Sequence, residues 1–265
     1  MGEPERRGTS SMRIAISSGH GLFVRGARGI IDEVDEARKV TDRVAAILRT
    51  AGVGVNVFHE NSARTVSDNV GAIVRHHNSQ TRDLDVSIHF NSTASGATED
   101  RAIGVEVLHF TGNQATRTLA GRVAAAISNA SGLLLRHRQD SGAVARNNLS
   151  FLSNTKAPAI LIEVCFVVSR TDVRLYQQFF EEICRAIAST ISGRTILPEP
   201  PVVAPPEPPV IAPPEPPPAP PQPSPWAQEA WEWGIGLGLT DGTNPQGVPT
   251  REQMVTLLHR YHNIV

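Results

Sequence analysis

Long hydrophobic runs are missing from this chain of 265 residues. No apolar stretch reaches the roughly 18 to 20 residues that a helix needs to span a bilayer, so we predict no membrane span. The first residues, MGEPERRGTSS, also lack the roughly 7 to 15 apolar residues at the centre of a secretory signal. We therefore expect a disordered leader over residues 1–11, with Met12 as an alternative start, and a protein made in the cytoplasm without a signal peptide.

Cysteine and an excess of one charge are lacking as well. Cys165 and Cys184 are too few for a disulfide framework, and no CxxC motif or Cys/His cluster indicates a zinc finger. The formal net charge is -1. Residues 12–194 hold 21 Lys+Arg against 17 Asp+Glu, whereas residues 195–265 hold 2 against 7. A scattered excess of four positive charges is too small to predict nucleic-acid binding, although it suits a polyanionic surface such as a bacterial wall.

Proline is sparse except in one segment, since 16 of the 20 prolines lie between Pro198 and Pro225. The repeated APPEPP sequences there lack backbone donors and favour polyproline II, which acts as a semi-rigid spacer. A ligand for proline-reading domains is the alternative interpretation. We predict a linker over residues 195–225 that separates a domain of residues 12–194 from a small module of residues 226–265.

Within the larger domain, apolar runs typical of buried strands alternate with segments of helical period. This pattern predicts an α/β fold with a single twisted, mostly parallel sheet and helices on both faces. The small carboxyl-terminal module is expected to be all-α. The expected strands are residues 13–17, 53–58, 84–89, 103–110 and 159–166, and the expected helices are residues 32–50, 66–78, 114–131 and 172–192.

Three of the predicted strands carry a candidate functional side chain near the end where open α/β sheets build their sites. His20 follows the first strand through a glycine turn, His89 ends the strand that reads SIHFN, and Glu163 lies inside the apolar run ILIEV. Either histidine alone is compatible with an ordinary hydrogen-bonded loop residue. A carboxylate among Ile, Leu and Val is costly when it is desolvated without a partner. A partner for Glu163 is therefore expected.

Two imidazoles and one carboxylate, with an open fourth position, are the ligands of a catalytic zinc ion. The two histidines therefore need a third ligand. Glu33 in the first turn of the first helix is favoured, because apolar residues four, seven and eleven positions later share its helical face. An acid that only complements the helix dipole is the simpler interpretation of this residue. The acids that compete for the ligand role are Asp32, Asp35 and Glu36.

The order GH, helix-opening E, SIHFN and ILIEV resembles the zinc-dependent N-acetylmuramoyl-L-alanine amidases of the amidase-3 family. The resemblance covers nearly all of residues 12–194. It implies that His20, Glu33 and His89 bind Zn²⁺ and that Glu163 is catalytic.

Further positions extend this resemblance. Asn91 follows the SIHF element and Asn154 lies in the loop SNTKAPA before the last strand, so the resemblance implies that both contact substrate. The segment GHGLFVRGARG departs from the common family form, which reads GHGG followed by a DPGA-like loop. The shorter variant is similar to amidases of phage endolysins.

The activity that the resemblance implies is hydrolysis of peptidoglycan at the amide between N-acetylmuramic acid and the L-alanine of the stem peptide, by zinc-activated water. An endolysin or an autolysin would perform this reaction at the bacterial cell wall, and the missing signal favours release by a holin. The alternatives are a non-catalytic wall-binding protein and a zinc hydrolase of another amide. A third alternative is a Cys165 nucleophile paired with His89, because the two-residue alternation of a strand places Cys165 on the same face as Glu163.

Residues 226–265 resemble one S-layer homology module. The matching elements are the leading Trp226, the turn that contains WGI and GL, and the capping-box sequence TREQ that begins at Thr250. The resemblance implies that Arg251 contacts an anionic secondary polysaccharide of the wall. About 40 residues is near the lower limit for independent folding, so self-association or docking on the larger domain is expected. A helical hairpin that only dimerises is the alternative.

Overall fold

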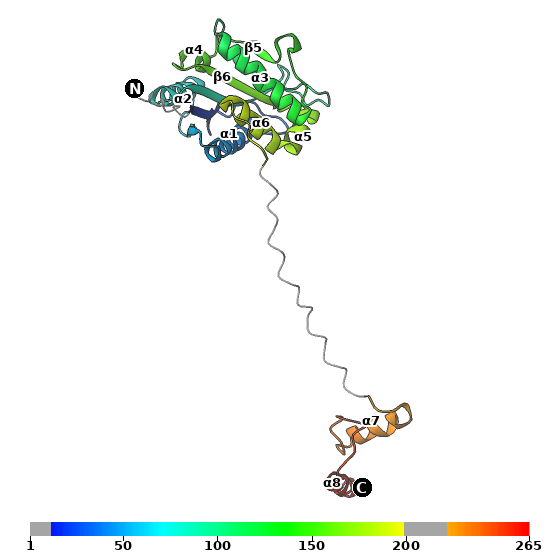
Figure 1. Ribbon diagram of the computed structural model, residues 1–265. Coiled ribbons are helices and arrows are strands. Elements are labelled where there is room, and N and C mark those ends of the chain that lie inside the picture. Colours follow the sequence, from blue (N-terminus) through cyan, green and yellow to red (C-terminus); the bar gives the residue numbers. More distant parts are fainter. Residues whose placement is uncertain (1–11, 199–221, 265) are drawn as a thin grey trace, which may run out of the picture. The chain divides into compact units, whose positions relative to one another are not determined.

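The computed structural model describes residues 12–198 and 222–264. The expected leader and most of the expected linker, residues 199–221, lie outside the described residues. The chain divides into two compact units, residues 1–200 and residues 201–265 (Figure 1). No helix in the described part combines the length and the apolar character that crossing a membrane requires.

The larger unit is built on one six-stranded sheet with the order β2-β1-β3-β6-β4-β5. Strands β1, β2, β3 and β6 are parallel, whereas β4 runs antiparallel to β6 and parallel to β5. The predicted mostly parallel sheet is confirmed. The strands are β1 (Arg13–Ser18), β2 (Gly54–Phe58), β3 (Leu84–Asn91), β4 (Glu106–His109), β5 (Ala143–Ala145) and β6 (Ala159–Phe166).

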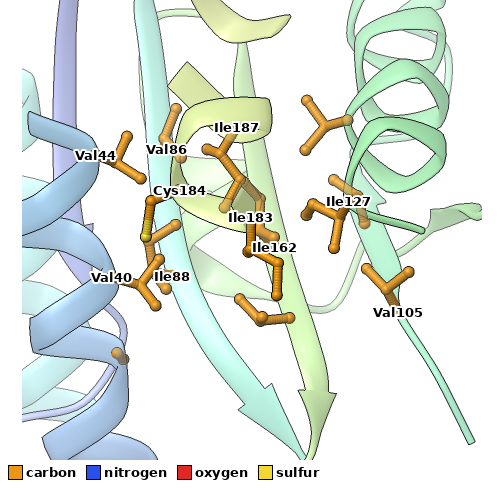
Figure 2. Close-up of a cluster of buried hydrophobic side chains, with 14 of the residues drawn as sticks. Val40, Val44, Val86, Ile88, Val105, Ile127, Ile162, Ile183, Cys184 and Ile187 are labelled. Atoms are coloured by element: carbon orange, nitrogen blue, oxygen red, sulfur yellow. The ribbon is translucent and has the colours of Figure 1, made fainter. Parts of the chain in front are cut away.

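Helices cover both faces of this sheet, as predicted. Figure 2 shows apolar side chains of α1, α3 and α6, among them Val44, Ile127 and Ile187, gathered against Ile88 and Ile162 of the sheet. A smaller cluster that includes residues of α2 and α4 fills the other face. The first layer consists of α1 (Glu33–Thr50), α3 (Gln114–Ser131), α5 (Arg170–Gln178) and α6 (Phe180–Ser192), and the second consists of α2 (Val66–Ser79) and α4 (Ser150–Asn154).

Helix α1 places the first acid of the candidate site. Asp32 caps the helix, since its carboxylate accepts a hydrogen bond from the Val34 amide (3.0 Å). Gly52 adopts φ +73° just beyond the last turn, a conformation that glycine reaches at little cost. The buried face carries Glu33 together with the apolar residues at +4, +7 and +11, as the spacing predicts. The helix therefore directs Glu33 toward the sheet rather than toward solvent.

One predicted helix is divided in the structure. Residues 172–192 form α5 and α6, because Phe179 leaves helical geometry (φ -115°, ψ 30°) between them. The ring of Tyr176 in α5 contacts Phe90 with a centroid separation of 4.9 Å, while Ile183 in α6 is buried in the main core. The bend lets both side chains pack against the sheet, and no proline or glycine marks it in the sequence.

The predicted strand over residues 103–110 is also shorter, because its first residues pair elsewhere. The Ile103 and Gly104 amides donate to the buried Asp172 carboxylate at 3.0 and 2.7 Å, and the Val105 amide donates to the Leu134 carbonyl at 2.9 Å. The ladder of β4 therefore begins only at Glu106. The short elements β5 and α4 were not predicted.

The pairing of β3 with β6 shifts near the edge where both strands end. His89 is opposite Glu163, but Asn91 is opposite Phe166, so β6 holds one residue more than β3 in this interval. Such a bulge interrupts the two-residue alternation of a strand. Cys165 belongs to the main core cluster and is fully buried there. The prediction that alternation places Cys165 on the side of Glu163 is therefore wrong.

The smaller unit is all-α, as predicted, with α7 (Gln228–Gly236) and α8 (Arg251–His262). The expected capping box is present, since the Gln253 amide donates to Thr250 Oγ1 (3.2 Å) and the Thr250 amide to Gln253 Oε1 (2.8 Å). Helix α8 contains no buried residue. Large apolar side chains of this unit remain exposed, among them Trp226, Trp233, Val255 and Leu258.

Candidate metal centre

Three predicted ligands meet where β1 and β3 end. His20 lies two residues beyond β1, His89 lies in β3, and Glu33 opens α1. Glu33 Oε1 is 3.0 Å from His89 Nδ1 and 3.6 Å from His20 Nε2. The two imidazole rings stand edge to face with centroids 5.1 Å apart. One ligand atom from each residue lies within 4.8 Å of the other two, so this group could hold a metal ion.

Backbone amides fix the Glu33 carboxylate. Its Oε2 accepts from the Ala27 amide (2.6 Å) and its Oε1 from the Phe90 amide (3.1 Å). Burial by itself would raise the pKa of Glu33, but the hydrogen bond and charge of His89 hold that pKa below its ordinary value. A Cβ at Gly26 would lie 2.3 Å from Glu33 Oε2, so glycine allows this close approach of the loop. The carboxylate is ionised and oriented, as a divalent cation requires.

The other acids near the start of α1 are engaged elsewhere. Asp32 and Asp35 both pair with Arg25. Glu36 accepts a hydrogen bond from the Tyr176 hydroxyl (2.8 Å) and pairs with a lysine on the surface of the same helix. Of the four acids that competed for the ligand role, Glu33 is the one that lies with the two histidines.

Small residues on either side hold the two histidines in place. A Cβ at Gly19 would overlap the His89 ring, at 1.8 Å from Nε2. The Gly19 carbonyl accepts from the buried Asn69 side chain of α2 (3.1 Å), which anchors the turn before His20. Ser87 Oγ lies 3.1 Å from His89 Nε2 and orients that ring from the opposite side. Sequence reasoning missed these supports, although Ser87 stands two residues before His89 on the same side of β3.

The two histidines differ in their electrostatic surroundings. Burial lowers the pKa of His20, which favours the neutral imidazole that binds a metal. Burial acts in the same direction on His89, but the hydrogen bond and charge of Glu33 raise the pKa of His89 above its ordinary value. In the described part, His20 Nδ1 is buried without a hydrogen-bond partner.

Glu163 lies beside His89, as its cross-strand neighbour between β6 and β3. Its Oε2 is buried and has no hydrogen-bond partner among the described residues. Burial raises the pKa of Glu163 to about 8, opposed by His89 and reinforced by the charges of Glu33 and Glu106. The partner expected from the sequence is therefore not a protein side chain in the described part, and the oxygen is free to receive a proton or a ligand.

A second buried glutamate, which the sequence analysis missed, lies opposite Glu163. Glu106 of β4 is the antiparallel register partner of Glu163. Its Oε1 accepts from Asn91 Nδ2 (2.8 Å), and its Oε2 accepts from Arg136 Nε (2.8 Å) and His137 Nε2 (2.9 Å). The signal that singled out Glu163, an acid inside an apolar run, is also present at Glu106. Asn91 thus lies beside the cluster, hydrogen-bonded to Glu106.

The remaining predicted residues lie elsewhere. Asn154 ends α4, before β6 begins, and its side chain donates to Ser150 Oγ (2.8 Å). Asn154 therefore precedes the amino-terminal end of β6, whereas Glu163 lies in the carboxyl-terminal half of that strand. Arg251 opens α8 in the smaller unit. Burial raises the pKa of the Cys165 thiol well above its ordinary value, which disfavours the thiolate that a nucleophile needs.

Two cavities in the described part, of about 350 and 520 Å³, lie beside the start of α3. Both are lined by Gln114, Arg117 and Asp140, and neither includes a residue of the metal cluster. The chemistry-bearing side chains are thus gathered at one edge of the sheet, and these hollows lie apart from them.

The donor set fits a zinc ion. Two imidazoles and a carboxylate, with room for a water molecule, form the open tetrahedral set of catalytic zinc sites. Two buried polar atoms at the cluster, His20 Nδ1 and Glu163 Oε2, have no hydrogen-bond partner in the described part of the chain. Buried polar atoms are normally satisfied, so unsatisfied ones at a cluster of ligand side chains indicate a place where a further group is received.

An open α/β sheet that gathers two imidazoles and two carboxylates at the end of its parallel strands defines a candidate metal-binding hydrolase. The chain belongs to the N-acetylmuramoyl-L-alanine amidase family (Amidase_3), whose model matches residues 14–192. The match covers the whole sheet apart from Arg13, the first residue of β1, and all of the residues that meet at the candidate metal centre.

Solved structures share the fold. The catalytic domain of the CD27L endolysin targeting Clostridia Difficile superposes with a TM-score of 0.58 at 22% identity, over 70% of this chain and 99% of that chain. The N-acetylmuramoyl-L-alanine amidase AmiC2 of Nostoc punctiforme superposes with a TM-score of 0.54 at 25% identity, over 69% of this chain and 97% of that chain.

Among curated sequences, an uncharacterized protein of Clostridium perfringens (strain 13 / Type A) is 28% identical over 186 residues, which are 70% of this chain and 53% of the relative. An uncharacterized 38.4 kDa protein of Clostridium perfringens is 28% identical over 190 residues, 68% of this chain and 53% of that relative. The chain thus spans about half the length of the curated relatives that it matches.

Proposed function

We propose that this protein is a peptidoglycan hydrolase that cleaves the amide between N-acetylmuramic acid and the L-alanine of the stem peptide. The observation that carries the proposal is the group formed by the half-buried His20 and His89 and the buried Glu33, with Glu163 beside it, in a chain of the amidase family. The ligand geometry supports zinc as the metal.

His20, Glu33 and His89 would hold the zinc ion. When bound, zinc polarises the carbonyl under attack and lowers the pKa of a water molecule toward neutrality. Because the metal supplies that activation, the chain needs no serine or cysteine nucleophile. The protein contributes orientation: backbone amides and Ser87 hold Glu33 and His89 at fixed angles before substrate arrives.

Glu163 moves the proton. Its free Oε2 accepts the proton of the attacking water and delivers it to the nitrogen of the departing L-alanine. One residue can act first as base and then as acid only if its pKa lies near the working pH, and burial raises the pKa of Glu163 to about 8. Glu106 supports this by placing a negative charge directly across the sheet.

The proposal is tested by incubating the purified protein with purified peptidoglycan and measuring three quantities: bound metal, newly formed L-alanine amino groups and sugar reducing ends. We expect about one zinc per chain, new amino groups and no new reducing ends. Binding to peptidoglycan without release of amino groups would indicate a non-catalytic wall protein. Cleavage of unrelated amides with intact peptidoglycan would indicate a different zinc hydrolase.

We further propose that the smaller unit is a wall-binding module that an endolysin or autolysin uses at the bacterial cell wall. Its exposed apolar side chains, including Trp226 and Trp233, support association with another surface or with a second copy. Arg251 would contact an anionic secondary polysaccharide of the wall. Proline repeats in residues 195–225 would act as the spacer between the catalytic domain and this module.

Deletion of residues 199–265 is expected to leave activity on soluble fragments unchanged and to weaken activity on intact walls. The cut is placed after Pro198 because the Ile196 amide donates to Ser189 Oγ (3.2 Å) and the Ile196 side chain packs against the main core. A wall-binding module raises the local concentration of enzyme at an insoluble substrate without changing the chemical step. Rates on both substrates, measured for the full and shortened chains, check this.

Arg251→Gln in the full chain serves as the matched point variant, and it should reproduce part of the loss on intact walls. The effect should fade at high salt, because screening shortens the range of the interaction. Aggregation of the shortened chain, or loss of its metal, would show that the carboxyl-terminal helices are needed by the catalytic domain.

A further inference from the structure

Arg136 stands beside the candidate catalytic residues with most of its hydrogen-bonding capacity unused. Its Nε donates to Glu106 Oε2 (2.8 Å), and its guanidinium carbon lies 4.7 Å above the centre of the Phe166 ring. Its side chain is 30% exposed. Neither Nη atom hydrogen-bonds to another residue in the part of the chain that the structure describes. The guanidinium is therefore anchored at one edge and on one face, while the Nη edge is available.

Other arginines of the larger unit use their guanidinium groups differently. Arg82 contacts both oxygens of Asp85 through Nε and Nη2 (2.9 Å each) and also reaches Asn78. Arg25 uses Nε and Nη2 on the carboxylate of Asp32. In both cases a protein carboxylate accepts hydrogen bonds from two nitrogen atoms of the guanidinium. Glu106 accepts from Arg136 at Nε only, since its Oε2 also accepts from His137 and its Oε1 accepts from Asn91 instead.

Two strand pairings place Arg136 next to the reaction. Glu106 is the register partner of Glu163, and directly opposite residues have Cβ atoms about 4.5 to 5.5 Å apart. Phe166, under the guanidinium, is opposite Asn91, which follows the metal cluster along β3. Arg136 therefore lies about one glutamate side chain away from the atom that would transfer the proton.

We propose that Arg136 receives a substrate carboxylate, the one carried by the residue that follows L-alanine in the stem peptide. The inference rests on the proposed function. An extended peptide advances about 3.3 to 3.6 Å per residue, so a group on the second residue lies ~7 Å from the cleaved bond. Arg136 is set back from Glu163 by Glu106, which pairs with Glu163 across the strands and accepts from Arg136. A guanidinium with two free donors binds a carboxylate in a bidentate manner and binds a carboxamide less well. Arg136 thus makes the protein selective for stem peptides in which this carboxylate is free rather than amidated.

The experiment compares two soluble muramoyl dipeptides that differ only at this group, one with a carboxylate and one with a carboxamide. The readout is kcat/KM from the appearance of L-alanine amino groups. We expect the full chain to prefer the carboxylate by about 10-fold, the range of a charge-assisted hydrogen bond. In Arg136→Gln the preference should fall to within about twofold, mainly through a higher KM for the carboxylate substrate, and Arg136→Lys should restore it only in part.

Arg117→Gln is the matched control, because Arg117 is an exposed arginine whose partner is Asp140 on the surface. It should keep the preference. Circular dichroism of each variant shows whether the fold is retained, and the comparison of substrates in the unmodified chain does not depend on any variant. Equal rates on the two substrates would overturn the inference and leave the proposed function standing, as would an equal loss on both in a folded Arg136→Gln. No release from either substrate would overturn the proposed function and the inference with it.

Discussion

Glu163→Gln should lower turnover on peptidoglycan fragments by at least about 100-fold, the usual loss when a general acid or base is removed. The substitution keeps the size and shape of the side chain but removes its ability to accept a proton. Bound zinc should stay at the level of the unmodified chain, since Glu163 is assigned no ligand role. Turnover on soluble fragments, together with metal analysis of the same samples, measures the two effects separately.

Thermal unfolding of the metal-free Glu163→Gln variant tests the same residue independently of turnover. Burial raises the pKa of Glu163 to about 8 from its ordinary value of 4.5, so the folded chain binds this proton more tightly than the unfolded chain. Glu163 therefore lowers the free energy of unfolding as the pH rises between these two values. Glu163→Gln should remove that loss, and the metal-free variant should have the higher Tm at pH 8. Glu182→Gln on the exposed face of α6 is the control. In the turnover assay, a rate for Glu163→Gln within tenfold of the unmodified chain would refute the role of Glu163 in proton transfer.

Loss of an imidazole ligand is expected to abolish zinc binding and activity together. His20→Ala or His89→Ala leaves two protein ligands, and a site of three ligands with an open position cannot lose one without losing much of its affinity. Changes in residues that only orient ligands already cost about 10- to 100-fold, so the loss here should exceed about 100-fold in metal affinity. Zinc titration with a competing chelator measures the affinity, and release of L-alanine amino groups measures the activity.

A matched pair of glutamates in α1 sharpens this test. Glu33→Gln should lose zinc and activity, because Glu33 Oε1 lies between the two histidines. Glu36→Gln should keep both, since Glu36 contacts the Tyr176 hydroxyl instead, and should at most lower the Tm slightly. Loss of zinc in Glu36→Gln but not in Glu33→Gln would show that the ligand is Glu36, one helical turn later. Full zinc content in both histidine variants would refute the site.

The sheet and the meeting of three ligands could be predicted because each depends on a regular repeat. Strand ends of a parallel sheet meet at one edge, so His20 and His89 were expected together. The helical period then selected Glu33 from four neighbouring acids, since only one of them could face the sheet. The expected domain bounds rest on the change in composition at the proline-rich segment, residues 195–225, and they stay a prediction.

What the sequence did not reveal depends on contacts between residues far apart in the chain. Arg136 and His137 reach Glu106 across thirty residues, and no local pattern indicates that they converge there. The break at Phe179 and the early end of β4 arise from tertiary packing and from the buried Asp172. Asn154 was assigned by resemblance alone, and the structure places it before the amino-terminal end of β6, away from Glu163.

The extra residue of β6 sets a limit on how this chain can change in length. Residues after the bulge, including Phe166 under Arg136, face as they do because one residue between Glu163 and Phe166 is unmatched in β3. Exchange of Cys165 for another small side chain leaves this count intact. Loss or gain of one residue in the same interval would turn Phe166 and the chain after it to the opposite face. Single substitutions in this segment can therefore be selected one at a time, whereas an insertion or a deletion would also displace the residues beside the reaction site.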